Sequence, residues 1–418
     1  MPDRTIPPPF RPIKRPRFAW PQAASLVPGL PLWVLHAGTQ PIVKLELIFD
    51  AGTWYEPHPG VAHFTAKMLL EGTQHRSAQE IARYIDQYGA SLAVKVQPDT
   101  WSLTLVTLSK HLTPMLALLA ELLLAPGFPA ERLDHLKQRK REALKLAAEK
   151  NSHLARRHFQ ALLFGDTHPY GRHLTEDALA AITLTQIQQY YQNQLLAGCR
   201  VLVSGQVDDQ ALTTIRQYLQ PLPVQAPPTA VAQASILAPD QLHVPKPDSL
   251  QAALNLGKVL PPKSHPDYLP LLVVNELLGG FFGSRLMRNL REDKGYTYGI
   301  SARIVSLQQT AYLVIATEVI QAQARAACQE IDKEIERLQT VPVSPEELGT
   351  LQNHMLGAWL AAINTPFAVM DQFKAVYLHG LDRIYYEQLY DTITQMTSPQ
   401  IMALSQQYLD GLSRVVVG

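Results

Sequence analysis

The chain contains only two cysteines, Cys199 and Cys328, among 418 residues. Two cysteines cannot build a disulfide framework or a cysteine-based metal cluster, so the hydrophobic core must hold the fold, and this scarcity suits a reducing compartment. An excess of either charge is also lacking, because 37 Lys and Arg stand against 36 Asp and Glu and leave a net charge of +1. This balance argues against a large phosphate-binding surface and against nucleic acid as a partner.

Long hydrophobic runs are lacking as well. No apolar run approaches the ~20 residues that span a bilayer, and the best one, 115–125, contains Glu121 and predicts a buried helix. Five basic residues lie in the N-terminal segment, but prolines interrupt it where a signal peptide needs a continuous apolar core. We therefore expect no membrane association and a location in the bacterial cytoplasm. We expect residues 1–20 to form an extended, polyproline-like arm on this protein or a partner, with a polyanion-binding arm as the alternative.

An internal repeat organises the remaining sequence. Residues 221–246 are rich in Pro and Ala, show no sustained periodicity and predict a linker. Residues before this segment recur after it, at offsets that drift only from 207 to 214. The recurring residues are His58, Leu70, Gly72, Thr183, Gln186 and Arg200 in the first half and His265, Leu277, Gly279, Thr397, Gln400 and Arg414 in the second. We predict two homologous domains, 21–220 and 247–418.

Hydrophobic periodicity predicts the same order of elements in each half. An alternating strand and an amphipathic helix come first, a strand pair and long helices follow, and a helix with a Val-rich strand closes each half. The predicted strands are 43–50, 91–96, 100–108, 251–257, 296–305 and 311–319, and the predicted helices 61–70, 112–124, 130–150, 269–278, 321–339 and 345–363. The fold class is therefore α+β: two homologous rolls, each a mostly antiparallel sheet with helices on one face, form a bilobed, clam-shell subunit.

The segment GTWYEPHPGVAHFTAKMLLEGT, 52–73, raises the question of catalysis. Together with the duplicated halves and the HPYG at 168–171, it resembles the insulinase/pitrilysin family of zinc metallopeptidases, which includes the mitochondrial processing peptidase. The resemblance covers essentially the whole chain. It implies a helix that reads H-x-x-E-H in active members, with two zinc-binding His and a Glu that acts on the attacking water. It also implies a second Glu ligand about 75 residues downstream.

This chain departs from that motif, because 63–67 reads HFTAK. By the resemblance, His63 takes the first ligand position, Ala66 that of the general base and Lys67 that of the second ligand. Glu142, with 74 residues between it and Lys67, lies where the third ligand is expected. Only two of the three ligands that a catalytic zinc needs are therefore present.

The two substitutions act against a metal and against catalysis. The Lys67 ammonium has only donors and repels a divalent cation, and Ala66 cannot accept a proton, which removes the ~10²–10⁴-fold in rate that a general base supplies. We predict no metal and no catalytic residue in this chain, no peptidase activity of the chain alone, and a salt bridge between Lys67 and Glu142. The alternatives are a hydrogen-bonded interior His63 and a solvated i,i+4 ion pair of Glu142 on a charged helix.

Four further histidines, His153, His158, His168 and His173, lie close together in sequence and raise the alternative of a relocated metal site. Their spacings do not repeat on one helical face. The carboxylate among them, Asp166, fits no ligand spacing of a known motif. We therefore disfavour such a site.

The second half carries a different pair of residues. Arg291 and Tyr298 lie seven apart in REDKGYTY. By the resemblance, an Arg and a Tyr in such an R-x-x-x-G-x-x-Y arrangement hold substrate beside the zinc of the N-terminal half. A guanidinium can grip a peptide carbonyl or a developing oxyanion, and a Tyr hydroxyl adds a hydrogen bond. The alternative is that Arg291 pairs with a neighbouring carboxylate and Tyr298 packs on the sheet.

The N-terminal domain thus has an incomplete zinc motif, whereas the C-terminal domain has the Arg/Tyr pair. By the resemblance, this combination implies a heterodimer in which one subunit carries zinc and the other the Arg/Tyr pair. We predict a non-peptidase subunit of a heterodimeric zinc metallopeptidase, with a homologous zinc-bearing subunit as partner and an unfolded peptide as substrate. The cofactor, zinc, is expected only in the partner. The first alternative is an inactive scaffold subunit without a peptidase partner, like the core proteins of a respiratory complex. The second is an independently active enzyme with an altered metal site.

Overall fold

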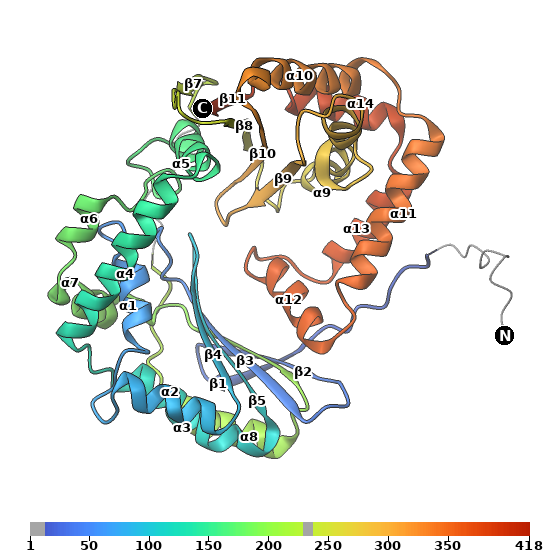
Figure 1. The fold of residues 1–418 in the computed structure, drawn as a ribbon. Helices are drawn as coiled ribbons and strands as arrows, with labels where there is room; N and C mark the ends of the chain where they lie inside the picture. Colours follow the sequence, from blue (N-terminus) through green and yellow to red (C-terminus); the bar gives the residue numbers. More distant parts are fainter. Residues whose placement is uncertain (1–12, 229–236) are drawn as a thin grey trace, which may run out of the picture.

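The structure is a computed structural model that describes residues 13–228 and 237–418. Two lobes form an arc, in which the first lobe, through α8, lies at the lower left of Figure 1 and most of the second lobe at the upper right. The first lobe contains β1 (Gln22–Val27), β2 (Leu30–His36), β3 (Ile42–Phe49), α1 (Val61–Met68), α2 (Ala78–Gln87), β4 (Ser91–Val96), β5 (Trp101–Leu108), α3 (Leu112–Leu124), α4 (Ala130–Ala148), α5 (Asn151–Phe164), α6 (Glu176–Ala181), α7 (Leu184–Tyr190), β6 (Arg200–Gly205) and α8 (Asp209–Leu219). The second contains β7 (Gln241–Val244), β8 (Gln251–Leu260), α9 (Tyr268–Asn275), β9 (Ile300–Ser306), β10 (Ala311–Ile320), α10 (Ala324–Thr340), α11 (Pro345–Ala361), α12 (Pro366–Tyr377), α13 (Ile384–Gln395), α14 (Ser398–Tyr408) and β11 (Ser413–Val417).

Short 3₁₀ or π-helical turns join several of these elements, at Ser109–His111, Tyr191–Leu195, Glu276–Gly280, Met287–Asp293 and Gln321–Gln323. In the described residues each lobe contains one sheet, with the strand orders β1-β2-β6-β3-β5-β4 and β7-β11-β8-β10-β9. The pairs β2/β6 and β7/β11 are parallel and the other pairs antiparallel. The predicted α+β class with two mostly antiparallel sheets is therefore confirmed.

Two sequence-based boundaries need correction. The expected strand 296–305 begins only at Ile300, because the segment before it forms an exposed loop that carries Tyr298. The expected linker, 221–246, includes β7, which pairs in parallel with β11. β7 is too short to show a periodicity, and its partner strand lies at the end of the chain. The limits of the two domains stay predictions, and residues 1–12 of the expected arm lie outside the described residues.

The repeated residues make equivalent contacts in the two halves. Thr183 begins α7 and donates its N–H to Gln186 Oε1 at 2.9 Å, and Thr397 begins α14 and donates to Gln400 Oε1 at the same distance. Each pair is a capping box, which satisfies N–H groups that the first turn of a helix leaves without partners. The repeat in the sequence therefore identifies two equivalent helices: α7, which precedes β6, and α14, which precedes β11.

Each sheet buries one face against helices of its own lobe. On β3, alternate residues Val43, Leu45 and Leu47 enter a core with α1, α3 and α7. The second sheet does the same through Leu254 and Leu256 on β8. Since successive side chains of a strand point to opposite faces, each sheet keeps a second face that these cores leave uncovered.

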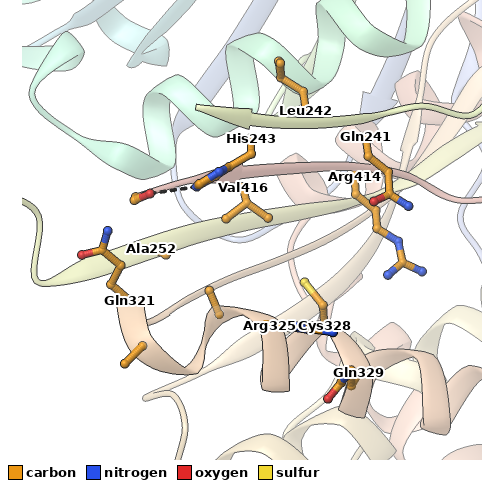
Figure 2. A pocket seen from close by; sticks show the side chains of 13 residues that line it. Gln241, Leu242, His243, Ala252, Gln321, Arg325, Cys328, Gln329, Arg414 and Val416 are labelled. Carbon is orange, nitrogen blue, oxygen red and sulfur yellow. Dashed lines mark hydrogen bonds between the residues drawn. The ribbon is translucent and has the colours of Figure 1, made fainter. Parts of the chain in front are cut away.

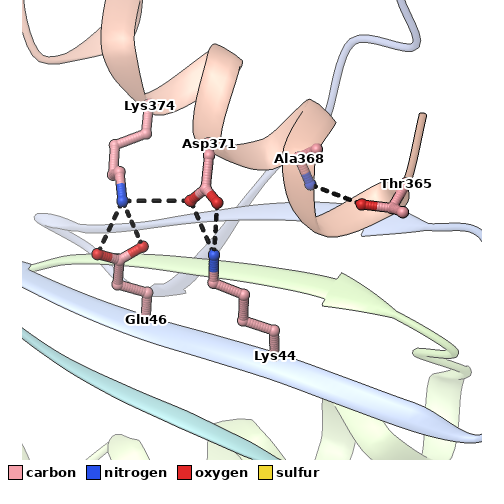
Figure 3. Close-up of polar contacts among 6 residues, drawn as sticks. All are labelled: Lys44, Glu46, Thr365, Ala368, Asp371 and Lys374. Atoms are coloured by element: carbon pink, nitrogen blue, oxygen red, sulfur yellow. Dashed lines mark hydrogen bonds and ion pairs between the residues drawn. The ribbon is translucent and has the colours of Figure 1, made fainter. Parts of the chain in front are cut away.

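A helix of the second lobe covers that second face of the first sheet. α12 packs Met370 and Phe373 against Ile48 of β3. Lys44 and Glu46 alternate with the core residues of β3 and therefore also lie under α12 (Figure 3). Burial there requires partners for both charges.

The partners come from α12. Lys374 Nζ donates to both carboxylate oxygens of Glu46 at 2.9 and 3.0 Å, and Lys44 Nζ to Asp371 at 2.8 Å (Figure 3). The Glu46 side chain is only 6% exposed. Burial by itself lowers the pKa of Lys374, but the charges of Glu46 and Asp371 outweigh it and raise that pKa. The four side chains thus form one ionic network between the lobes.

α5 makes the reciprocal contact, from the first half onto the second sheet. Its Phe159 packs in one cluster with Ala253 of β8 and Val415 of β11. Gly257 allows this close approach, because an added Cβ would lie 1.9 Å from the Leu313 carbonyl oxygen and 3.1 Å from Phe159 Cζ. Figure 1 shows α5 beside β8 and α12 beside the first sheet, so each lobe lends one helix to the other.

The HPYG segment makes a third connection between the lobes. Tyr170 donates its hydroxyl to Asp99 Oδ1 at 2.5 Å, and the other oxygen of Asp99 accepts the N–H of Gln308 at 3.1 Å. Gln308 lies in the turn between β9 and β10, and Asp99 in the turn between β4 and β5. This motif therefore fixes the position of the β9–β10 turn.

The described part of the N-terminal arm, 13–20, has no regular secondary structure and lies on this chain. Phe18 stacks on Tyr386 with ring centroids 4.7 Å apart, and Arg15 pairs with Asp391. Among the described residues, no helix combines the length and apolar character that a membrane crossing requires.

The ionic network gives a stability prediction. Lys374→Met leaves the buried Glu46 carboxylate without its cation, which should lower the free energy of unfolding by roughly 3 kcal/mol. The matched control Lys333→Met removes a lysine that is 65% exposed and pairs with Glu330 on its own helix. It should cost less than about 1 kcal/mol. Both values come from urea unfolding followed by circular dichroism.

Adding Glu46→Gln to Lys374→Met removes the unpaired charge and should restore part of the lost stability. Equal stability of K374M and K333M, or no recovery in the double variant, would contradict a stabilising network between the lobes.

Candidate functional site

The degenerate motif lies on α1, whose start is held by a buried carboxylate. Gly60 precedes the helix with a left-handed φ of 97°. Glu56 Oε2 accepts the Ala62 N–H at 3.0 Å and so satisfies one of the free donors of the first turn. Burial raises the pKa of Glu56 to about 7. Sequence reasoning missed this role of Glu56, although a carboxylate a few residues before a helix is a recognisable capping signal.

His63 and Lys67 lie one helical turn apart, as the motif requires, while Ala66 is fully buried in the core. Lys67 Nζ donates to the Val94 carbonyl of β4 at 3.4 Å. Burial, and next the charges of Lys140 and Lys67, lower the pKa of His63 to about 4. The imidazole is therefore neutral at pH 7, and two ammonium groups act on it.

Glu142 does not join this group. It lies on the exposed face of α4 and accepts a hydrogen bond from Gln138 Nε2, four residues earlier, at 2.9 Å. The predicted salt bridge between Lys67 and Glu142 is wrong, because no ion pair of either residue occurs within the described chain. The alternative, a solvated i,i+4 ion pair of Glu142, is wrong as well, because its i,i+4 partner is the uncharged amide of Gln138. Sequence spacing could not show that Lys140 of the same helix acts on His63.

These donors do not fit a zinc ion. A catalytic zinc needs three nitrogen, sulfur or oxygen donors, whereas His63 has the cationic side chains of Lys67 and Lys140 as its charged neighbours. Within 13–228 and 237–418, no three His, Cys, Asp or Glu side chains gather as a metal site would require. That the chain carries no zinc stays a prediction.

Of the four other histidines, His153, His168 and His173 make contacts with other protein groups, and no metal cluster of the described residues includes any of the four. His168 accepts the Tyr170 N–H at 3.1 Å and lies edge-on to Trp54. His173 Nε2 lies 2.9 Å from the Arg157 carbonyl oxygen. The disfavoured idea of a relocated metal site gains no support from these contacts.

Arg291 and Tyr298 line one hollow of about 610 Å³ in the second lobe. Tyr298 is 96% exposed, and the Arg291 guanidinium carbon lies 4.5 Å from the ring centroid of Phe282, itself largely exposed. No ion pair of Arg291 occurs among the described residues. The alternative, a paired Arg291 and a packed Tyr298, is therefore wrong, and the structure brings the two together without joining them to α1.

A second hollow of about 610 Å³ lies between β7, β11 and α10, where sequence reasoning expected nothing (Figure 2). Cys328 and Arg325 line it from α10, and His243 Nε2 lies 3.0 Å from the Gly418 oxygen at its rim (Figure 2). Burial raises the pKa of the Cys328 thiol, which disfavours the reactive thiolate. The residues of α1 and the Arg291/Tyr298 pair do not line this hollow.

Comparison with known proteins fits these observations. Residues 33–177 match the family model described as insulinase, peptidase family M16, and residues 181–355 match that of the peptidase M16 inactive domain. The chain therefore belongs to the insulinase family of peptidases. Both lobes are accounted for, since the two matches follow one another along the chain.

Relatives within the family carry contrasting names. The uncharacterized zinc protease YmxG of Bacillus subtilis is 23% identical over 75% of this chain and 76% of its own length. The non-peptidase homolog YmxG of Helicobacter pylori is 27% identical over 58% and 57%. The cytochrome b-c1 complex subunit 2 of Schizosaccharomyces pombe is 32% identical over 20% of both chains. The fold matches a crystal structure of a peptidase M16 inactive domain from Pseudomonas fluorescens, with TM-score 0.87, 23% identity and coverage of 95% and 98%.

The donor set predicts how metal binding responds to substitution. The purified chain should bind no stoichiometric zinc, and Lys67→His should raise zinc affinity by about tenfold or more, because a repelling cation becomes a second imidazole ligand. The matched control Lys145→His makes the same change at an exposed position of α4 and should leave zinc affinity unchanged. Competition with a chromophoric chelator measures all three proteins. Stoichiometric zinc in the unaltered chain, together with peptide hydrolysis by it alone, would contradict the prediction.

The lowered pKa of His63 predicts a dependence of stability on pH. The unfolded chain protonates this histidine below about 6.5 and the folded chain only near 4, so stability is lost as the pH falls through that window. His63→Asn should remove about 3 kcal/mol of this loss. His75→Asn, at an exposed histidine, is the matched control and should retain the full loss. Urea unfolding at intervals from pH 7 to 4 checks this, and parallel curves for H63N and the unaltered chain would overturn it.

Proposed function

We propose that this chain is a non-peptidase subunit of a heterodimeric zinc metallopeptidase. It supplies Arg291 and Tyr298 to peptide substrate beside the zinc of a homologous partner subunit. The observation that carries the proposal is the contrast between the lobes. Tyr298 is 96% exposed beside Arg291, which forms no ion pair within 13–228 and 237–418, whereas burial and the charges of Lys140 and Lys67 lower the pKa of His63. A substrate-contact pair without a hydrolytic centre needs a second chain to supply that centre.

The chemistry of the pair supports a role in substrate contact. Tyr298 is exposed, and Arg291 has no carboxylate partner in the part of the chain that the structure describes, so their placement side by side adds little to the stability of the free chain. Against a peptide, both can donate to backbone carbonyl oxygens, and both can stabilise the oxyanion that forms during hydrolysis. Phe282 holds the Arg291 guanidinium through a cation–π contact, so less side-chain entropy is lost when Arg291 binds a peptide.

The second candidate is an inactive scaffold subunit, favoured by the S. pombe relative that is named as a subunit of the cytochrome b-c1 complex. The matched stretch is short, and the exposed Arg291/Tyr298 pair has no use in a pure scaffold. We place the proposed heterodimer in the bacterial cytoplasm, in keeping with the low cysteine count and the mostly bacterial relatives.

The proposal predicts the behaviour of the assembled peptidase. The tagged chain, purified from its native organism, should bring down a homologue whose sequence contains an intact H-x-x-E-H, identified by mass spectrometry. In that complex, Arg291→Ala and Tyr298→Phe should each lower peptide turnover by about 10²-fold, the usual effect of losing one oxyanion donor. Size-exclusion chromatography should show unchanged assembly.

Arg325→Ala is the matched control, because Arg325 is exposed in the same lobe but lines the hollow of Figure 2. Turnover should be unaffected. Unchanged turnover in R291A and Y298F would remove the substrate-contact role, and a complex without any H-x-x-E-H subunit would favour the scaffold.

A further inference from the structure

The hollow of Arg291 and Tyr298 does not end at that pair. A second hollow of about 430 Å³ adjoins it, and both are lined by Gly299 and Glu318. The smaller hollow lies on the face of the second sheet that packs against α5, and the larger one borders it at Gly299 and Glu318. We call the two adjoining hollows the arginine groove and define it by Arg156, Arg291, Arg303, Tyr312 and Glu318.

The floor of the arginine groove has the length of an extended peptide. Tyr312, Val314, Ala316 and Glu318 lie at alternate positions of β10 and therefore share one face. Tyr312 is only 7% exposed and packs with Phe159 of α5, so the open part of the row runs from Val314 to Glu318. At 3.3 Å per residue this part is ~13 Å long, which matches about four residues of extended chain. Small and apolar side chains in its middle allow a peptide backbone to lie close to the sheet.

Arginines from three separate segments surround this floor. Arg156 comes from α5, Arg303 from the edge strand β9 and Arg291 from the Met287–Asp293 turn. Glu318 is the acidic residue among those that line the two hollows, so the lining has an excess of two positive charges, three minus one. The whole chain has a net charge of only +1, which makes this a local concentration of cations.

These arginines lack carboxylate partners among the described residues. The polar contact of Arg156 is to His153 Nδ1 at 3.2 Å, and both Arg156 and Arg303 lie close enough to Tyr312 to act on its hydroxyl. The positive charge of arginines near a surface is ordinarily balanced by nearby carboxylates. Here the side chains converge on open space from both halves of the chain.

We propose that the arginine groove binds an extended, acidic segment of the peptide substrate, whose Asp and Glu side chains pair with Arg156 and Arg303. This inference rests on the proposed function, because the groove begins at Arg291 and Tyr298. The length and apolar floor select a peptide over a small anion. The excess positive charge selects acidic side chains, which a guanidinium binds with charge-assisted hydrogen bonds.

The test measures binding to the chain alone, without a partner. A fluorescein-labelled peptide rich in Asp and Glu is compared by fluorescence anisotropy with its counterpart in which every Asp is Asn and every Glu is Gln. The acidic peptide should bind at least about tenfold more tightly, and its affinity should fall as salt is raised. Equal affinities, or no binding of the acidic peptide, would overturn the proposal.

The arginines are then replaced singly. Arg156→Gln and Arg303→Gln should each weaken the acidic peptide by roughly threefold to tenfold, and Arg303→Lys should lose less than Arg303→Gln. Arg325→Gln, in the hollow of Figure 2, is the matched control and should bind as the unaltered chain does. Unchanged affinity in R156Q and R303Q, or a loss in R325Q alone, would place the acidic peptide elsewhere and overturn the proposal.

Failure of this inference is distinguishable from failure of the proposed function. If turnover of the complex falls in R291A while the chain binds both peptides equally, the subunit role stands and the arginine groove is rejected. If the chain prefers the acidic peptide through Arg156 and Arg303 while R291A leaves the turnover of the complex unchanged, the groove stands as a binding site and the substrate-contact role is rejected.

Discussion

Each sheet in this chain has one face that its own lobe cannot cover, and the architecture depends on how that face is buried. α12 of the second lobe covers the first sheet, and α5 of the first half covers the second. The exchange makes the lobes dependent on one another, since removing either helix would expose a hydrophobic sheet face to water. It also explains why charged residues on β3 are tolerated: Glu46 and Lys44 meet Lys374 and Asp371 under the borrowed helix.

The same exchange builds the candidate binding surface. α5 contributes Phe159 to the interface and Arg156 to the arginine groove, so one helix both seals the second sheet and provides a wall of the groove. The Asp99–Tyr170 contact holds the β9–β10 turn, and these strands carry the floor residues. The proposed binding surface therefore needs both halves of the chain and cannot belong to either lobe alone.

Much of the fold follows from local sequence, and the rest depends on distant partners. The 3.6- and 2-residue periodicities placed most long helices and the central strands, and the Thr183/Thr397 repeat identified equivalent capped helices. From the alternation on β3 we expected helices on only one face of its sheet, but α12, more than 300 residues away in sequence, buries the other face. For the site, spacing predicted the positions of His63, Ala66 and Lys67 on one helix. It could not predict that, besides burial, the charge of Lys140 lowers the pKa of His63, because that effect depends on how α4 packs against α1.

The charges around His63 add to the missing ligand in disfavouring a zinc ion at α1. A single reversal at Lys67 would restore an imidazole, yet Lys140 would still act on the site and Ala66 would still offer no base. A complete zinc site with water activation therefore requires changes at several positions, of which Lys67→His alone supplies only a second imidazole. The peptide binding proposed for the arginine groove needs no such set of changes, because guanidiniums can bind carboxylates without a metal. On the proposed function, a subunit that shares catalysis with a zinc-bearing partner needs only the second of these properties.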